Sequence, residues 1–194
     1  MPAFRRRPLL GAVAAAALSL PAQAQASEIR FGALFPFTGP LALLGDESFR
    51  GLEIAVEDRN AAGGLLGRPV RLVRGDAVDE AQAVAETRRL IGGERLPAIF
   101  GTHASPLAFA ASQVAELQGV LYFELGATSD TITERGFRWL FRSCPRAADF
   151  GAVSVGAVAD TLAPAFGMEP AALRVAVLHE DGLYGQAIAA AQAQ

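Results

Sequence analysis

Hydrophobic and polar positions along the chain follow two different periods. Short apolar runs bounded by glycine and proline are typical of buried strands, whereas longer segments with apolar residues three and four apart are typical of helices. This pattern predicts extended segments over 29–34, 70–73, 98–101, 120–123, 140–142 and 175–179. It predicts helices over 46–60, 80–91, 106–117, 149–162 and 184–191. Strands that alternate with helices form βαβ units, so we expect an α/β fold with a doubly wound parallel sheet.

The N-terminal segment 1–26 has the pattern of a secretory signal peptide. Arg5, Arg6 and Arg7 are followed by an apolar run over 9–20, and Ala24-Gln25-Ala26 fits a cleavage site between small residues. The apolar run is too short to span a hydrocarbon core of about 30 Å as a helix. We therefore expect an exported chain whose mature form begins at Ser27 and lies in the periplasm.

The charge of the predicted mature chain excludes some partners. The signal carries three of the 17 basic residues and none of the 20 acidic ones, which leaves a net charge of −6 for residues 27–194. This balance does not fit nucleic acid or an anionic membrane surface as a partner. No later segment is apolar and long enough to cross a membrane, so we expect a soluble mature form. Cys144 is the only cysteine, so an intramolecular disulfide is impossible.

Small polar residues follow three of the predicted strands, where ligands bind in parallel α/β sheets. "GTHASP" occupies 101–106, "ELGATSD" occupies 124–130 and "HEDGLYG" occupies 179–185. Ser105 precedes Pro106 at a predicted helix start, where unpaired N–H groups favour an anion such as a carboxylate. Ser105 could instead only cap its own helix, as Asp46 is expected to cap the first one. Tyr184 could cover a ligand or pack under its own helix.

An enzyme is the alternative class of function. His103, Ser105 and Glu124 could form a Ser-His-acid set on a flavodoxin-like fold, but no G-x-S-x-G motif places the serine at a strained turn. His179 lacks neighbours with zinc-ligand spacing. G-x-G-x-x-G does not follow the first strand, and a P-loop is impossible without lysine. We therefore predict a binding protein that needs no metal and no cofactor.

The stretch "FTGPLALLGDESFRGLEIAVEDRNAAGGLLGRPVRLVRGD" resembles the start of the type I periplasmic binding proteins of the leucine/isoleucine/valine family. In that family a helix ends in Asn-x-x-Gly-Gly-x-x-Gly-Arg, here Asn60 to Arg68, and a strand and an aspartate follow, here Asp76. "AIFGTHAS", "LGATSD", "FRSCP" and "VAVLHEDGLYG" come next in the family's order and spacing. The resemblance covers Ile29 to about Ile188.

The resemblance implies two doubly wound lobes around a cleft. Residues 27–145 would form an incomplete N-terminal lobe and residues 146–194 the start of a truncated second lobe. The cleft would capture a branched-chain amino acid, or a similar small carboxylate or amide, for the membrane subunits of an ABC importer. The same lobes also serve receptors that sense a ligand, which stays an alternative.

The resemblance also implies a set of ligand contacts. The loops around Ser105 and Thr128 would hold the ligand's carboxylate through hydroxyl and backbone N–H groups, and Tyr184 would close over it. Leu44 stands where the family often has an aromatic residue, and Glu124 where it often has a small one. We expect Glu124 to be a solvated charge rather than a partner of the ligand's ammonium group. The complete set of expected ligand-binding residues is Leu44, His103, Ala104, Ser105, Gly126, Ala127, Thr128 and Tyr184.

Overall fold

The protein is built on one parallel β-sheet. The computed structural model describes residues 27–194, so the predicted signal peptide at 1–26 lies outside the described residues. Five strands pair in the spatial order β2-β1-β3-β4-β5, and every pair is parallel. Their bounds are β1 (Ile29–Phe35), β2 (Val70–Asp76), β3 (Ala98–Gly101), β4 (Leu121–Glu124) and β5 (Leu140–Arg142). The predicted α/β fold with a parallel sheet is confirmed.

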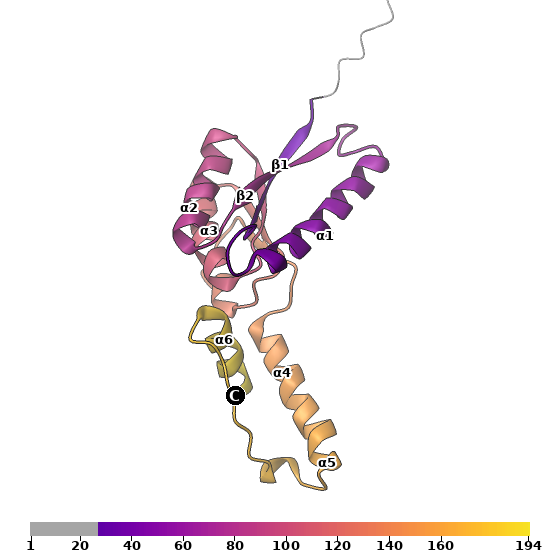
Figure 1. Cartoon of the computed structure of the whole chain (residues 1–194), viewed down its shortest axis with the longest axis vertical. Coiled ribbons are helices and arrows are strands. Elements are labelled where there is room, and N and C mark those ends of the chain that lie inside the picture. The colour runs from indigo at the N-terminus through magenta and orange to yellow at the C-terminus, as the bar shows by residue number, and fades with distance from the viewer. Residues whose placement is uncertain (1–26) are drawn as a thin grey trace, which may run out of the picture.

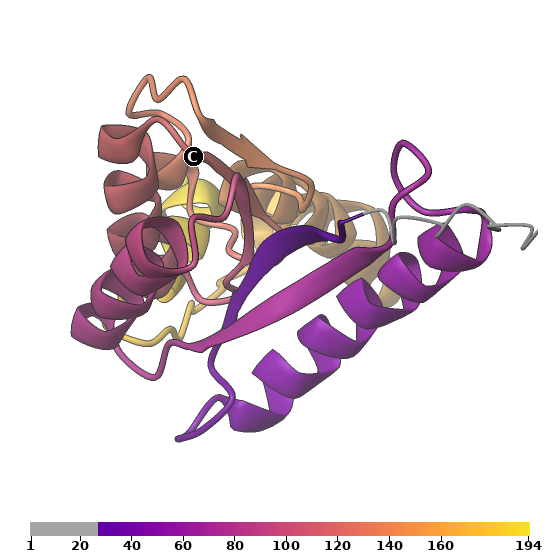
Figure 2. The same ribbon diagram turned by 90° about the horizontal axis from the view of Figure 1, so that it is seen from above.

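Helices cover both faces of the sheet. In Figures 1 and 2, α1 (Ala42–Ala61) lies on one face, and α2 (Glu80–Arg88) and α3 (Ser105–Gln118) lie on the other. A π-helical turn, η1 (Arg89–Gly93), extends α2. Because the strand order reverses between β1 and β3, the loops that follow these two strands leave in opposite directions and open a crevice at their carboxyl ends.

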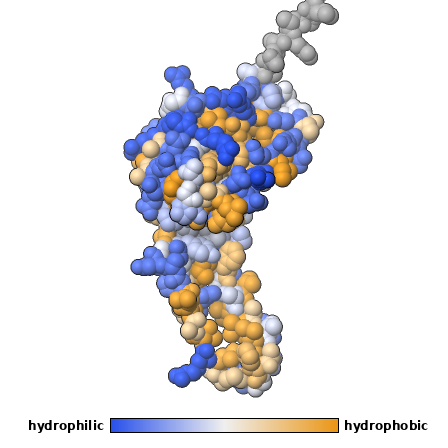
Figure 3. All heavy atoms as spheres, viewed as in Figure 1, coloured by the Kyte–Doolittle hydropathy of each residue, from blue (hydrophilic) through white to orange (hydrophobic). Residues whose placement is uncertain are grey.

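The residues after β5 add helices only. These are α4 (Ala147–Ala157), the turn η3 (Val158–Leu162), α5 (Ala163–Ala165) and α6 (Leu183–Gln192), with the short 3₁₀ turn η4 (Pro170–Ala172). Another 3₁₀ turn, η2 (Asp130–Ile132), lies between β4 and β5. Helices α4 and α6 pack closely, since a Cβ on Gly151 would lie 2.6 Å from that of Ala191. Figure 3 shows mostly hydrophobic residues on the visible surface of this part. Phe166, between α5 and η4, is 67% exposed. The predicted lobe boundary at 145/146 stays a prediction.

The main core lies between the sheet and helices α2 and α3. Leu34, Leu90, Ile99 and Tyr122 have no exposed surface there. A smaller cluster of Ala33, Phe35 and Phe49 lies under α1. Side chains alternate between the faces of a strand, which explains how neighbours such as Leu34 and Phe35 join different clusters.

Four phenylalanines lie side by side on the α1 face of the sheet. Phe31, Phe100, Phe123 and Phe141 come from β1, β3, β4 and β5, and we call them the phenylalanine row. Phe100 lies 5.7 Å from Phe31 and 5.9 Å from Phe123 between ring centroids. Helix α1 packs on β1 and β2, and Phe141 at the far end of the row is 50% exposed.

No helix between Ser27 and Gln194 combines the length and the apolar character that a membrane crossing requires.

Two local predictions are wrong. Helix α1 begins at Ala42 rather than after Asp46, because the turn at Gly39 lets the Ala42 N–H donate to the Gly39 carbonyl 3.2 Å away. Asp46 instead forms an ion pair with Arg50, one turn along the helix, at 2.9 Å. The predicted strand at 175–179 is irregular, with Leu178 fully exposed. An apolar run becomes a strand only beside a partner, and this segment pairs with no strand among residues 27–194.

Candidate functional site

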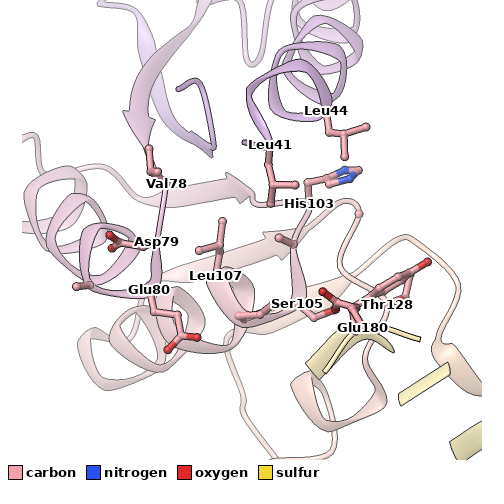
Figure 4. Close-up of a pocket in the computed structure, with 15 residues that line it drawn as sticks. Leu41, Leu44, Val78, Asp79, Glu80, His103, Ser105, Leu107, Thr128 and Glu180 are labelled. Carbon is pink, nitrogen blue, oxygen red and sulfur yellow. The ribbon is translucent and has the colours of Figure 1, made fainter. Parts of the chain in front are cut away.

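A cavity of about 990 Å³ lies at the carboxyl ends of the strands. Residues that follow β1, β2, β3 and β4 line it together with residues at the start of α6 (Figure 4). This is the crevice that the reversal of strand order creates. Of the eight residues expected at the site from the sequence, all except Ala127 line this cavity.

One wall of the cavity is apolar. Leu41, Leu44, Val78 and Leu107 come from the loops and helix starts after β1, β2 and β3, and Figure 4 shows them around the same space. Only Leu44 among them was predicted from the sequence. Each of the other three lies a few residues after the end of a strand. This position is the only feature of the sequence from which they could have been predicted. The wall suits an apolar part of a ligand.

The loop after β1 is held by a carboxylate from the neighbouring strand. Asp76, at the end of β2, accepts hydrogen bonds from the Phe37 N–H at 2.8 Å and from the Thr38 hydroxyl at 2.6 Å. These bonds fix the loop that leads into α1 and so place Leu41 and Leu44 at the cavity.

Ser105 joins two of the loops that line the cavity. It is the first residue of α3, and extended Ala104 holds the cap position. The Ser105 hydroxyl accepts a hydrogen bond from the Ser129 N–H at 3.3 Å, rather than from an N–H of its own helix. The alternative in which Ser105 only caps α3 is therefore wrong. The N–H groups in the first turn of α3 have no carbonyl within the helix to receive them.

Thr128 presents a buried hydroxyl without a partner. The residue is 7% exposed and lines the cavity, as Figure 4 shows. Its Oγ1 has no hydrogen-bond partner among the residues that the structure describes. A buried hydroxyl left unpaired costs about 1–3 kcal/mol, so its presence in a cavity wall requires an explanation.

Glu124 is buried, and the expectation of a solvated charge is wrong. It has no exposed surface. Its Oε1 accepts from the N–H groups of Gly126 at 2.9 Å and Ala127 at 2.8 Å, and its Oε2 accepts from the Thr102 N–H at 2.6 Å. Burial raises the pKa of Glu124, and these backbone bonds oppose the increase. Because Gly126 and Ala127 already have a partner for their N–H groups, α3 and the hydroxyls of Ser105 and Thr128 remain as donors toward the cavity.

His103 is not part of a catalytic set. Its Nδ1 lies 3.1 Å from the Ser48 hydroxyl of α1, and its backbone N–H, rather than its ring, bonds to Glu124. Its φ of 96° places the ring in the cavity wall beside Leu44 (Figure 4). Burial lowers the pKa of His103, which favours a neutral imidazole near pH 7. The structure does not assemble the Ser-His-acid arrangement considered for an enzyme.

Two residues reach the cavity from the C-terminal segment. Tyr184, in the first turn of α6, is 50% exposed, and Glu180 lies in the loop that precedes α6. Glu180 accepts a hydrogen bond from the Gly185 N–H at 3.2 Å, which ties the loop to the start of α6. Glu180 lines the same cavity as Ser105 and Thr128, and Figure 4 shows it on the side away from Leu41 and Leu44.

Cys144 lies behind the cavity, and its thiol donates to the Ala127 carbonyl at 3.2 Å. Burial and the nearby Glu124 carboxylate raise the pKa of the thiol to about 11. Since only the thiolate is reactive, we expect iodoacetamide at pH 8 to alkylate the folded chain at least about a hundredfold more slowly than a free thiol of pKa about 8.5. Mass spectrometry over time checks this, with the urea-unfolded chain as control. A rate in the folded chain equal to the control would contradict it.

The comparison of sequences decides the family. The sequence profile of the periplasmic binding proteins matches residues 28–194. The chain belongs to this family. The chain is 52% identical over 178 residues to the Leu/Ile/Val-binding protein homolog 7 of Brucella suis. The aligned region covers 92% of this chain and 45% of that protein. The chain therefore spans a little under half the length of this curated relative.

Solved structures of periplasmic binding proteins share the fold. The branched-chain amino acid transporter substrate-binding protein LivJ from Streptococcus pneumoniae, in complex with isoleucine, has 29% identity and a TM-score of 0.67 over 70% of this chain and 39% of that one. A solute-binding protein of an ABC transporter from R. palustris, in complex with benzoate, has 25% identity and a TM-score of 0.73 over 86% of this chain and 44% of that one. Both relatives are binding proteins, which agrees with the prediction that the chain is not an enzyme.

Proposed function

We propose that the chain is the ligand-binding part of the substrate-binding protein of an ABC importer. The ligand is a small carboxylate with an apolar side chain, with branched-chain amino acids as the leading class. The observation that carries this proposal is the unpartnered Thr128 hydroxyl in the cavity wall. It lies beside Ser105 at the start of α3, where helix N–H groups favour negative charge.

The two sides of the cavity fit the two ends of such a ligand. The carboxylate would meet the hydroxyls of Ser105 and Thr128, and the apolar side chain would face Leu44 and Leu107. Isoleucine and benzoate, the ligands in the two related structures, both combine a carboxylate with an apolar body. Tyr184 would cover the ligand from the segment 146–194, which we propose as the start of a second lobe. Export to the periplasm and docking to importer membrane subunits belong to the same proposal.

Thr128→Val tests the role of the hydroxyl. The change keeps the shape of the side chain and removes the hydrogen bond, so we expect affinity for L-leucine to fall by about tenfold. The melting temperature should stay the same or rise, because the change removes a buried hydroxyl that has no partner among the residues that the structure describes. Nuclear magnetic resonance titration of the labelled chain at millimolar ligand measures the affinity, and circular dichroism measures the melting temperature.

Two analogues and a control variant sharpen this test. Isovalerate keeps the carboxylate and the isobutyl side chain of leucine but lacks the α-carbon that carries the ammonium group, and leucinamide lacks the carboxylate. We expect isovalerate to bind the wild-type chain and leucinamide to bind at least about tenfold more weakly. Thr87→Val is the matched control, because the Thr87 hydroxyl donates to the Ala83 carbonyl within α2. Wild-type affinity in Thr128→Val, or equal binding of the two analogues, would refute the carboxylate site.

A further inference from the structure

A single buried carboxylate connects the two loops that carry the hydroxyls of the cavity. Glu124 Oε2 accepts from the N–H of Thr102, and Oε1 accepts from the N–H of His103 at 3.2 Å; both donors belong to the loop after β3. Oε1 also accepts from the N–H groups of Gly126 and Ala127, in the loop after β4. We call Glu124 and these four donors the Glu124 cluster.

The Glu124 cluster lies directly behind the cavity wall. Glu124 is fully buried, and its carboxylate uses backbone donors rather than facing the cavity. On the loop after β3, Ala104 and Ser105 follow the cluster immediately, and on the loop after β4, Thr128 follows it immediately. The loops also touch, since a Cβ on Gly126 would lie 3.0 Å from the His103 Cα. The position of each hydroxyl therefore depends on a bond made just before it in the chain.

The cluster needs an ionised acceptor at both oxygens. Each carboxylate oxygen receives at least one backbone N–H, and the Thr102 hydroxyl lies 3.2 Å from Oε2. A glutamine amide could keep Oε1 as an acceptor, but its NH₂ group would then face the Thr102 N–H, and two donors repel. Hydrogen bonds to a charged acceptor are about twice as strong as neutral ones. The cluster thus holds the two loops only while Glu124 is a carboxylate.

We propose that Glu124 is a positioning residue of the ligand site, which sets the distance between Ser105 and Thr128 without touching the ligand. This inference rests on the proposed function of the cavity. It gives the charged residue at the end of β4 a function that neither solvation nor binding of an ammonium group explains.

The test compares Glu124→Gln with a matched change elsewhere in the same chain. Glu116→Gln is the control, because the Glu116 carboxylate also accepts backbone N–H bonds, from Arg138 at 3.0 Å and Trp139 at 2.9 Å, but at the opposite end of α3. Amide resonances of the ¹⁵N-labelled chain without ligand give the first measurement. We expect the resonances of Ser105 and Thr128 to move in Glu124→Gln and to stay in place in Glu116→Gln.

Ligand affinity and chemical rescue give the second measurement. With L-leucine as the probe, Glu124→Gln should lose about tenfold in affinity and Glu116→Gln less than about twofold, because only the first change displaces the two hydroxyls. In Glu124→Ala, formate should fill the vacated anion site and return the Ser105 and Thr128 resonances toward their wild-type positions. Methylammonium is the control for the rescue.

The outcomes separate this inference from the proposed function. If only the amides of the cluster move in folded Glu124→Gln, while Ser105 and Thr128 keep their resonances, Glu124 is structural and the inference is wrong. If Ser105 and Thr128 move but the wild-type chain binds neither leucine nor isovalerate, the positioning holds and the proposed function fails. Should Glu124→Ala not fold, Glu124→Gln decides the question alone.

Discussion

Gly45→Ala is expected to destabilise the protein by at least about 2 kcal/mol, although alanine is the best helix former. Gly45 lies in α1, and a Cβ there would lie 2.0 Å from the Pro36 carbonyl oxygen. Because both atoms are fixed by backbone, the helix must move away from the end of β1. Urea unfolding followed by circular dichroism measures the loss in the free energy of unfolding.

Gly51→Ala in the same helix is the matched control. A Cβ at Gly51 meets no atom within 4 Å, so we expect this change to stabilise the protein by about 0.5–1 kcal/mol. Equal effects of the two substitutions would show that the contact between α1 and Pro36 is not close. The contact matters for function, since α1 carries Leu44 into the cavity wall.

Leu90→Ala is expected to cost about 2–5 kcal/mol of stability, because Leu90 is fully buried in the main core. Its side chain fills space that a glycine leaves open: a Cβ on Gly75 of β2 would lie 3.0 Å from the Leu90 Cδ1. Gly75→Ala should therefore destabilise the wild-type chain and cost less in the Leu90→Ala chain, where Leu34 Cδ1 at 3.1 Å remains as a close neighbour of the new Cβ. The expected coupling is about 1 kcal/mol.

A double-mutant cycle with urea unfolding measures that coupling. Leu140→Ala with Gly75→Ala is the control pair, because Leu140 lies on β5 at the opposite edge of the sheet from β2. The effects of the control pair should add. If the effects of the Leu90 and Gly75 substitutions also add, the close packing of Leu90, in η1, against Gly75 of β2 is contradicted.

The period of the apolar residues predicted all five strands of the sheet, together with a sixth at 175–179 that the structure does not form. Strands at 98–101 and 140–142 match the observed bounds, and the alternation of strands and helices predicted the parallel fold. Strand β2 extends beyond its apolar run to Asp76, because its last residues pair with Leu34 and Phe35 of β1. Such an extension depends on a partner that is distant in the sequence, so it leaves no local signal.

The sequence predicted where the site lies in the fold better than it predicted the contacts of its individual residues. The rule that ligands bind beyond the carboxyl ends of parallel strands brought Ser105, Thr128 and Tyr184 to one cavity. Glu124 was misjudged because charged residues are rarely buried and because two of its donors, Thr102 and His103, belong to the loop after a different strand. The segment 175–179 was misjudged for a related reason, since its apolar pattern equals that of true strands. The ligand contacts themselves stay predictions.

The order of the strands also determines how long β1 waits during synthesis for its second neighbour in the sheet. Strand β1 is made first, yet in the sheet it lies between β2 and β3, and β3 follows only after α1, β2 and α2 have been made. At about 5–20 residues per second, a ribosome that has finished β1 needs roughly 3 to 13 seconds to complete that second neighbour. During this interval one edge of β1 has no partner. Under the proposed export to the periplasm, a translocation machinery that engages the chain within those seconds meets no finished sheet that it would have to unfold.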